Sequence, residues 1–396
     1  MTSKCSEILE CIKNVIGPIK EEVTINLHEP EFKNSNSLKY LEDCIKTGWV
    51  SSAGKWVKEF ETRIAEYTGA KNVIAVSNGT VALRLALYSA GVKPNEEVLI
   101  PPLSFVATAN SVSHLGAIPH FIDIEPETLG MCPVALEKRL KDITVKKGKF
   151  LFNKFTGNRI SAVLPVHVFG LPAQINSIKK ICLNWEIPLI EDAAEALGSW
   201  DSADENKRHC GCIGDIGTLS FNGNKIITTG GGGALLTNNK RIADFARHVS
   251  TTAKLKHPWD FFHDQIGWND RLPNLNAALG VAQFEKLEFK LNKKRRLFTT
   301  YKEKFSEINS AEIINERENT ISNYWLVTLR IKENDESKLL ERILQKSHDA
   351  GIFLRPAWKL LNDLPMYAKS PSGNLKESFK QSKRLINLPS SPQLIK

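Results

Sequence analysis

The sequence has no uninterrupted run of about 18 apolar residues, which a membrane-spanning helix needs, so we expect no membrane span. Its first residues, MTSKCSEILECIKNVIGPIKEE, lack the continuous apolar block of a signal peptide and instead carry apolar residues at helical spacing: Ile8, Leu9, Ile12 and Ile16. The seven cysteines are scattered along the chain. Without an export signal, an odd number of scattered cysteines fits free thiols in a reducing compartment, so we expect a cytoplasmic protein.

Zinc-finger spacing, ribonucleoprotein motifs and internal repeats are also missing, although the net charge is +9. The densest basic run, KLNKKRRLF at 290–298, continues the helical pattern of NAALGVAQFEKLEFKLNKKRR, whose charges we place on the outer face. A basic surface also suits an anionic small substrate such as a nucleotide sugar. We expect no nucleic-acid binding. We expect no metal either, because His209, Cys210 and Cys212 provide too few ligands at zinc spacing.

A chain of 396 residues is long for one core, which predicts two domains. From about residue 70 to 240, short apolar runs such as NVIAV, EEVLI, IPHFI and ISAVL alternate with helical patterns. This alternation predicts an α/β domain over residues 1–274, with a mostly parallel sheet covered by helices. We interpret IPLIEDAAEALGS as a strand running into a helix.

After about residue 275 the pattern changes, and a smaller C-terminal α+β domain is predicted for residues 275–396. A long helix carries LNAALGVAQFEKL, NYWLVTLRI and IFLRPAW are typical of strands, and ESKLLERILQKSHDAG is typical of a helix. The polar stretch SPSGNLKESFKQS is expected to be a loop.

Lys225 stands among small residues and before four glycines in SFNGNKIITTGGGGALLTNN. A lysine there could be a solvated charge, a phosphate ligand or a nucleophilic amine that carries a cofactor. The Walker loop is excluded because Gly217 and Gly223 are one residue too far apart and Ile226 follows the lysine. The glycines suit a backbone that turns sharply or passes close to a planar ligand, or else a tight hairpin into GALLTN.

Three further stretches follow predicted strands, at the edge where ligands bind in such sheets. Asp192 ends the strand IPLI, where a carboxylate needs either a cationic partner or a role as helix N-cap. The turn SNGT at 77–80 precedes a helix whose first N–H groups could bind phosphate. Phe105, in LSFVATAN, could stack on a planar ligand or belong to the core. An amine, a carboxylate for a ring nitrogen, a phosphate cradle and a stacking ring together match the needs of pyridoxal phosphate.

The chain resembles the DegT-type sugar aminotransferases, which have the aspartate aminotransferase fold. Six ordered motifs carry the resemblance over nearly the whole chain: GTVALRLAL, SFVATANSVSHLGAIPHFIDIEPETLGM, PVHVFGLPA, EDAAEALGS, SFNGNKIITTGGGGAL and NDRLPNLNAALGVAQFEKL. The resemblance implies a pyridoxal phosphate-dependent transaminase. One branch of the family has histidine at the position of Lys225, and its members are dehydratases. This chain keeps the lysine, so the resemblance favours a transaminase.

The resemblance implies a role for each matching residue. Lys225 would bond to the cofactor aldehyde and Asp192 would pair with the ring nitrogen. The other cofactor-binding positions are Gly79, Thr80, Phe105, Glu195, Ser220 and Asn269. Asn269 and Arg271 lie in a segment that reaches the neighbouring subunit's active site in the family, which implies a homodimer with shared sites. The family has an aromatic residue where Asp270 stands here.

Finer motifs resemble a branch that acts on UDP-linked 4-keto-2-acetamido-6-deoxy sugars for bacterial surface glycans. They are NLHEPEF, GWVSSAGKWVKEFE, TTAKLKHPWDFFHDQIGWN, SNYWL and RPAWKLLNDLPMY. His167, His257 and Arg271 are candidates for contacting the sugar nucleotide, and each histidine could equally be structural. The alternatives are an aminotransferase for another keto sugar or keto position, and a non-catalytic regulator that keeps the fold.

Overall fold

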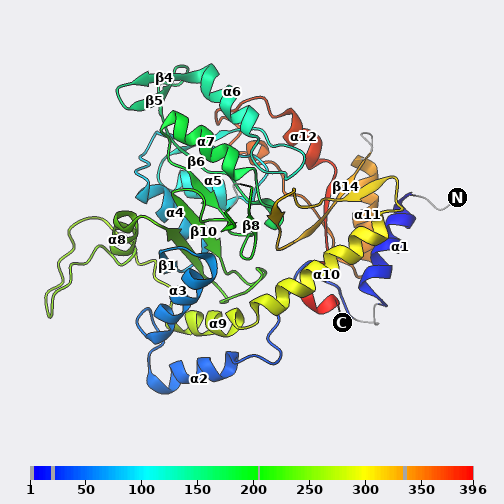
Figure 1. The fold of residues 1–396 in the computed structure, drawn as a ribbon, viewed down its shortest axis with the longest axis horizontal. Helices are drawn as coiled ribbons and strands as arrows, with labels where there is room; N and C mark the ends of the chain where they lie inside the picture. The colour runs from blue at the N-terminus through cyan, green and yellow to red at the C-terminus, as the bar shows by residue number, and fades with distance from the viewer. Residues whose placement is uncertain (1–3, 19–22, 204–205, 333–336, 396) are drawn as a thin grey trace.

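A computed structural model describes residues 4–18, 23–203, 206–332 and 337–395 (Figure 1). Its larger part contains one row of strands, in the order β1 (Asn72–Val76), β11 (Gly233–Thr237), β10 (Ile216–Ser220) and β7 (Ile190–Asp192). Single bridges from Val163 to Leu189 and from Val166 to Asp192 place β6 (Arg159–Val163) beside β7. Next come β2 (Glu97–Ile100) and β3 (Ile118–Phe121), both parallel to β6. Only β11 runs against its neighbours here, so the predicted, mostly parallel sheet is confirmed.

Helices cover this sheet, as the alternating pattern predicts (Figure 1). They are α3 (Lys55–Thr68), α4 (Gly79–Ser89), α5 (Ala107–Ser113), α6 (Pro133–Ile143), α7 (Ile175–Trp185) and α8 (Lys240–Val249). Two further helices lie below α3 in Figure 1: α9 (Asn274–Phe284) packs on α3, and α2 (Ser37–Thr47) packs on α9. The strands β4 (Thr144–Lys147) and β5 (Phe150–Asn153) extend the sheet beyond β6 as an antiparallel hairpin. Within the described ranges, no helix combines the length and apolarity that a membrane crossing requires.

The smaller part has an antiparallel sheet in the order β12 (Ala311–Ile313), β14 (Val327–Ile331), β16 (Leu385–Leu388) and β15 (Arg355–Pro356). The long helix α10 (Leu287–Phe305) runs from α9 toward this sheet and toward α11 (Ser337–Asp349) (Figure 1). The predicted N-terminal helix is α1 (Lys4–Ile16), and it packs on α10 and α11. We propose that the domains divide at residue 274, with α1 packing on the smaller one.

Three expectations about local structure were wrong. Residues 193–199 form consecutive turns after β7 and not a helix. The polar stretch expected to be a loop contains α12 (Lys376–Ser382), which Asp123 caps by accepting bonds from the backbone N–H groups of Glu377 and Ser378. The expected continuous helix breaks at residues 285–286, between α9 and α10.

The basic run on α10 also departs from the expected solvent-exposed face. Lys290 and Lys294 are 2% and 1% exposed. Lys294 donates hydrogen bonds to the backbone carbonyls of Trp325 and Ser390, at 3.1 and 2.5 Å. Burial therefore holds the pKa of Lys294 well below its ordinary value, and it lowers the pKa of Lys290 to about 8. These two lysines belong to the interior and add nothing to the basic surface.

Candidate active site

A cavity of about 320 Å³ lies where the loops after β1, β2, β7 and β10 meet the smaller part of the chain. Seven of the residues singled out from the sequence line it: Gly79, Thr80, Phe105, Asp192, Glu195, Ser220 and Lys225. The parallel arrangement of β2 and β7 brings their carboxyl ends to one edge of the sheet, where ligands bind in such folds. Trp325, Arg355 and Trp358 close the cavity from the other side.

Asp192 is the last residue of β7 and is buried, with only 4% of the residue exposed. Thr108 Oγ1 donates a hydrogen bond to Asp192 Oδ2 at 2.7 Å, and Ser104 Oγ lies 2.6 Å from the same hydroxyl. Burial raises the pKa of the Asp192 carboxyl, although the bond from Thr108 opposes this effect. Within the described ranges no cation forms a salt bridge with this carboxylate, although the charges of Lys225 and His167 act on it from further away, and a protonated ring nitrogen in the cavity would provide a direct partner.

Lys225 lies in the loop 221–232 between the antiparallel strands β10 and β11. Its ammonium group is 3.3 Å from Glu195 Oε1 and 3.7 Å from the centroid of the Trp325 ring. The indole N–H of Trp325 donates to the backbone carbonyl of Asn224 at 2.6 Å, which fixes the ring beside the lysine. Burial raises the pKa of Glu195, while the lysine favours its charged form. The amine is thus held at the cavity wall by one carboxylate and one aromatic face.

The turn before α4 provides free hydrogen-bond donors. The side chain of Asn78 accepts from the backbone N–H of Val81 as an N-cap, which leaves the first N–H groups of the helix, at Gly79 and Thr80, for a ligand. A Cβ on Gly79 would lie 2.8 Å from Ser220 Cβ, so only glycine lets the serine hydroxyl come this close to the helix start. A helix N-terminus beside a hydroxyl is a good site for a phosphate.

The four glycines after Lys225 serve the backbone and do not line the cavity. Gly230 has a φ of +80°, which residues with a Cβ rarely adopt. A Cβ on Gly233 would lie 2.5 Å from the backbone of Asn78, because β11 begins directly against the turn before α4. The sharp turn was therefore the correct explanation, whereas the tight hairpin was wrong, since twelve residues (221–232) join β10 to β11.

Comparison with known proteins identifies the family. Residues 32–396 match the model of the DegT/DnrJ/EryC1/StrS aminotransferase family. The chain belongs to this family. It is 35% identical to the GDP-perosamine synthase of Vibrio cholerae, over 93% of this chain and 95% of that protein. It is 30% identical to a UDP-2-acetamido-2-deoxy-3-oxo-D-glucuronate aminotransferase of Pseudomonas aeruginosa, over 72% of each chain. The crystal structure of a DegT/DnrJ/EryC1/StrS aminotransferase from Brucella abortus superposes with a TM-score of 0.80, at 28% identity and 90% coverage of both chains.

This aminotransferase uses pyridoxal phosphate, and the residues of the cavity fit the cofactor. Its helix N-terminus and Ser220 suit the phosphate, the buried Asp192 suits the ring nitrogen, and Phe105 presents an exposed ring to the cavity. The Lys225 amine faces the same space and suits the aldehyde. Bound pyridoxal phosphate supplies an aldehyde that bonds to amines and a ring that withdraws electrons from the reacting carbon. The assignment of each residue remains our proposal.

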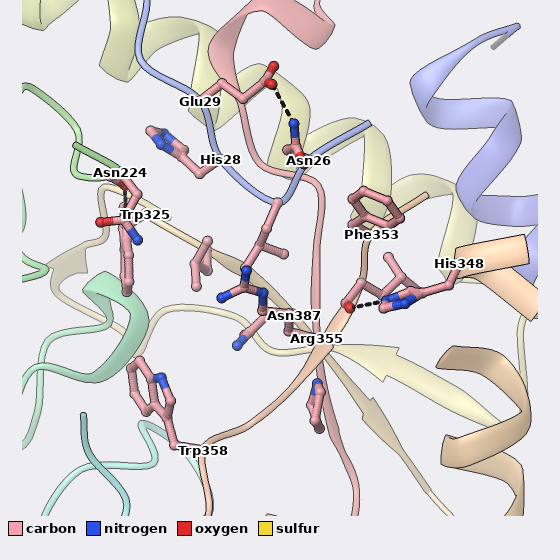
Figure 2. A pocket seen from close by; sticks show the side chains of 14 residues that line it. Asn26, His28, Glu29, Asn224, Trp325, His348, Phe353, Arg355, Trp358 and Asn387 are labelled. Atoms are coloured by element: carbon pink, nitrogen blue, oxygen red, sulfur yellow. Dashed lines mark hydrogen bonds between the residues drawn. The ribbon is translucent and has the colours of Figure 1, made fainter. Parts of the chain in front are cut away.

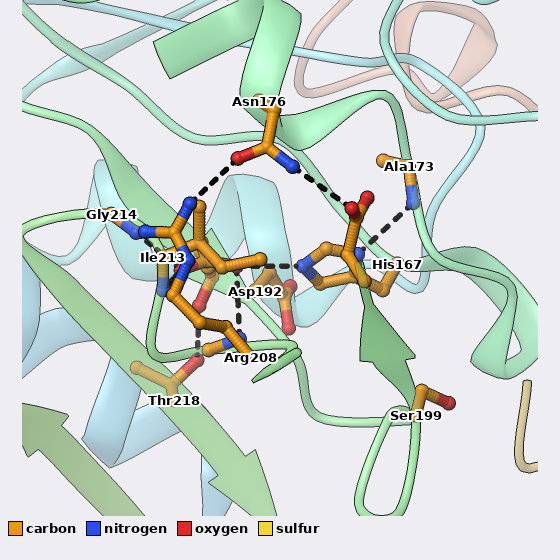
Figure 3. Close-up of polar contacts among 12 residues, drawn as sticks. His167, Ala173, Asn176, Asp192, Ser199, Arg208, Ile213, Gly214 and Thr218 are labelled. Atoms are coloured by element: carbon orange, nitrogen blue, oxygen red, sulfur yellow. Dashed lines mark hydrogen bonds and ion pairs between the residues drawn. The ribbon is translucent and has the colours of Figure 1, made fainter. Parts of the chain in front are cut away.

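The structure keeps His167 out of the cavity. Its ring is fully buried, with Nε2 3.0 Å from Glu191 Oε2, while Nδ1 accepts from the backbone N–H of Ala173 at 3.1 Å (Figure 3). Glu191 also accepts from three backbone N–H groups, of Gly211, Ile213 and Gly214. With both nitrogens in use, His167 serves to fix the strand ends around Asp192 and has no free group for a sugar.

Three other candidates lie outside the cavity. His257 is exposed and accepts at Nδ1 from the backbone N–H of Asp260, beside the exposed Trp259. Asn269 and Arg271 are exposed as well, next to the end of β1. The buried Asp270 between them pairs with Arg84, which gives the carboxylate at this position a cationic partner.

The loop with His209, Cys210 and Cys212 is also occupied by internal contacts. His209 Nε2 accepts from the backbone N–H of Gly198 at 2.8 Å, and the buried Cys210 contacts His167. In the described part of the chain, no group of three potential metal-ligating side chains is brought together. This loop therefore packs behind Asp192 as part of the interior.

Sequence reasoning overlooked the contributions of the smaller part. Trp325, Arg355 and Trp358 line the cavity, although their motifs SNYWL and RPAWKLLNDLPMY had only indicated the branch of the family. Trp358 packs against the ring of Phe169, with centroids 4.9 Å apart, and lies 6.2 Å from Phe105. The sequence signal that could have pointed to them was the presence of two tryptophans and an arginine in these short motifs, far from Lys225 in the chain.

Asn323 connects the smaller part to the turn that carries Glu195. It is fully buried, its Nδ2 donates to the carbonyls of Glu195 and Leu197 at 2.8 Å each, and its Oδ1 accepts from the N–H of Trp325 at 2.7 Å. Asn323→Ala leaves two buried carbonyls and one N–H unpaired, and we expect it to destabilise the protein by about 2–4 kcal/mol. Urea unfolding measures the loss.

The control for this prediction is Asn315→Ala. Asn315 is exposed, and within the described part of the chain its side chain accepts one long hydrogen bond, 3.4 Å, from the Tyr324 hydroxyl. We expect this variant to lose less than about 0.5 kcal/mol, as surface substitutions usually do. Equal losses in the two variants would contradict the role assigned to Asn323.

Proposed function

We propose that this enzyme transfers the amino group of L-glutamate to carbon 4 of a UDP-linked 2-acetamido-4-keto-6-deoxyhexose. The product would enter bacterial surface glycan synthesis. One observation carries the proposal: a single cavity holds the Lys225 amine, the buried Asp192 carboxylate and a capped helix start with free donors. The branch motifs support the UDP-linked 4-keto sugar, and the relatives named above act, by their names, on GDP- and UDP-linked sugars.

The residues of the chain divide the work. The Lys225 amine, once freed from the cofactor, would move the proton between the donor carbon and the cofactor as base and then acid. The negative charge of Asp192 would keep the ring nitrogen protonated, and Thr108 would hold that carboxylate in place. The rings of Trp325 and Trp358 would exclude water from one side of the cavity. Because amino donor and sugar acceptor would use the same cavity in turn, we expect ping-pong kinetics.

Substrate choice tests the proposal directly. We expect kcat/KM for the UDP-linked 4-keto-2-acetamido-6-deoxy sugar to exceed that of its GDP-linked counterpart by about 10²-fold or more, because a site built for one polar group rejects an analogue that leaves its donors unpaired. A 3-keto UDP sugar is the second comparison. Higher kcat/KM with either competitor would contradict the proposed substrate and favour the alternative of another keto sugar.

We further propose that the enzyme works in the cytoplasm as a homodimer with shared sites. After α8 the chain projects from the body (Figure 1) and exposes large apolar side chains: Leu255 (44%), Trp259 (81%), Phe261 (73%), Phe262 (58%) and Ile266 (83%). Isolated apolar residues are common on surfaces, but a group of this size marks an interface. His257, Asn269 and Arg271 lie on or beside this projection, where they could serve the site of a second copy.

A further inference from the structure

A second cavity, of about 600 Å³, adjoins the one that holds Lys225. The two share Asn224, Trp325, Arg355 and Trp358 as lining residues. The remaining walls include the N-terminal segment at 26–29, the segment that leads into β15, His348 on α11 and Asn387 on β16 (Figure 2). A ligand with one end at Lys225 can therefore extend past Arg355 into this second space.

Arg355 is the charged side chain at the junction. It begins β15, is exposed, and stands among the labelled side chains around the cavity in Figure 2. Within the described ranges, no carboxylate forms a salt bridge with its guanidinium: the carboxylate that lines the same cavity, Glu29, accepts from Asn26 Nδ2 at 2.6 Å. A guanidinium offers a planar fork of donors that matches a carboxylate, so a free one in a cleft favours an anionic ligand.

His28 provides a second, independent sign of a ligand. Both of its ring nitrogens are buried, and neither makes a hydrogen bond of full geometry with the described residues, although the backbone of Asn224 lies close enough to interact with the ring. Burial, together with the charges of Lys294, Lys290 and Lys225, lowers the pKa of His28 well below its ordinary value, so the ring is neutral and can both donate and accept. Buried polar groups are nearly always paired in a working protein, and Asn224 can serve only one of the two nitrogens, which leaves the other for a group that enters the cavity.

We propose that this second cavity binds the carboxylate end of the amino donor, with Arg355 as its ion-pair partner and His28 as an additional hydrogen-bond partner. The inference rests on the proposed function, because it presumes a dicarboxylic donor such as L-glutamate. The donor's amine lies at Lys225 while the far carboxylate reaches Arg355. The diphosphate of the sugar nucleotide is the other anion that could bind at Arg355. The two half-reactions distinguish them, because L-glutamate takes part only in the first and the sugar nucleotide only in the second.

The experiment compares Arg355→Gln with wild type in two single-turnover reactions. The first mixes enzyme loaded with pyridoxal phosphate with L-glutamate, and the second mixes enzyme loaded with pyridoxamine phosphate with the sugar nucleotide. Loss of a charge-assisted bidentate pair should lower the apparent affinity for L-glutamate by about 30- to 100-fold. We expect the second reaction to change less than about twofold, and Arg355→Lys to restore part of the first.

A binding measurement needs no turnover. Glutarate, an unreactive dicarboxylate, should bind the cofactor-loaded wild type in a calorimetric titration, and Arg355→Gln should lose most of that affinity. Arg296→Gln is the control, because Arg296 is an exposed arginine on α10, away from both cavities. We expect wild-type glutarate affinity and wild-type rates from it.

Three results would overturn the inference. A loss confined to the sugar reaction would assign the anion site to the diphosphate. Equal losses in both reactions would place Arg355 in a step that they share, and no loss in either would remove it from recognition. If wild type reacts with L-glutamate but accepts none of the sugar nucleotides, the proposed sugar substrate fails while the glutamate and glutarate measurements still decide the role of Arg355.

Discussion

Lys225→Ala is expected to lose at least about 10³-fold in turnover, because the variant lacks the amine that we propose moves the proton in both half-reactions. It should also lose the visible absorption that a lysine-bound cofactor gives, while still binding the cofactor through the phosphate site that we propose at the helix start, Gly79 and Thr80. Absorption spectra before and after L-glutamate, together with steady-state kinetics, measure both effects. Because the missing group is a small amine, added methylamine should restore part of the rate.

The control for the lysine variant is Lys240→Ala. Lys240 is exposed at the start of α8, and its one ion pair among the described residues is with Asp244, one helical turn away, so its loss should leave spectrum and rate unchanged. Normal turnover by Lys225→Ala would show that another residue carries the cofactor. The alternative of a non-catalytic regulator with the same fold would be favoured only if the wild-type protein remained colourless with pyridoxal phosphate.

Asp192→Asn should keep its fold and some cofactor but lose about 10²- to 10³-fold in kcat, the usual cost of removing one electrostatic stabiliser from an enclosed site. The amide has the same shape, so the bond from the Thr108 hydroxyl and the packing around β7 can persist. What changes is the negative charge that raises the basicity of the ring nitrogen. Both half-reactions should slow by a similar factor in single-turnover measurements.

Thr108→Val provides the matched comparison for the aspartate. It removes the hydroxyl that donates to Asp192 Oδ2 and leaves the charge in place. We expect Thr108→Val to lower kcat about tenfold, which corresponds to the loss of one hydrogen bond of about 1.5 kcal/mol. This loss is much smaller than the one expected from removing the charge in Asp192→Asn. A near-wild-type rate for Asp192→Asn would refute the pairing of this residue with the cofactor.

The sequence predicts the parallel part of the fold well, and the residues proposed for the cofactor side line one cavity, for a physical reason. Two of these residues end buried strands, Asp192 in β7 and Ser220 in β10, and a third, Gly79, begins α4. Parallel strands bring such positions to one edge of the sheet. Local pattern and tertiary position therefore coincide. The same logic misplaced residues 193–199, because Asn323 takes the carbonyls of Glu195 and Leu197 that a helix would have used.

The other half of the site could not be inferred from local pattern. Lys290 and Lys294 follow a helical surface pattern, yet they are buried because the segments at Glu31, Trp325 and Ser390 cover them with carbonyls. The sequence around the two lysines does not reveal that they are buried, because the segments whose carbonyls accept their hydrogen bonds are distant in the chain. Arg355 was missed for the same reason.

The bond from the Trp325 indole to the Asn224 carbonyl, beside those of Asn323, has a consequence for folding. The loop with Lys225 is completed by a segment of chain about 100 residues further on, so neither half can hold it in position alone. Local opening of the smaller part would take the cofactor site with it, and the two should melt as one cooperative unit. Cofactor binding would then stabilise the whole molecule and not the larger part alone.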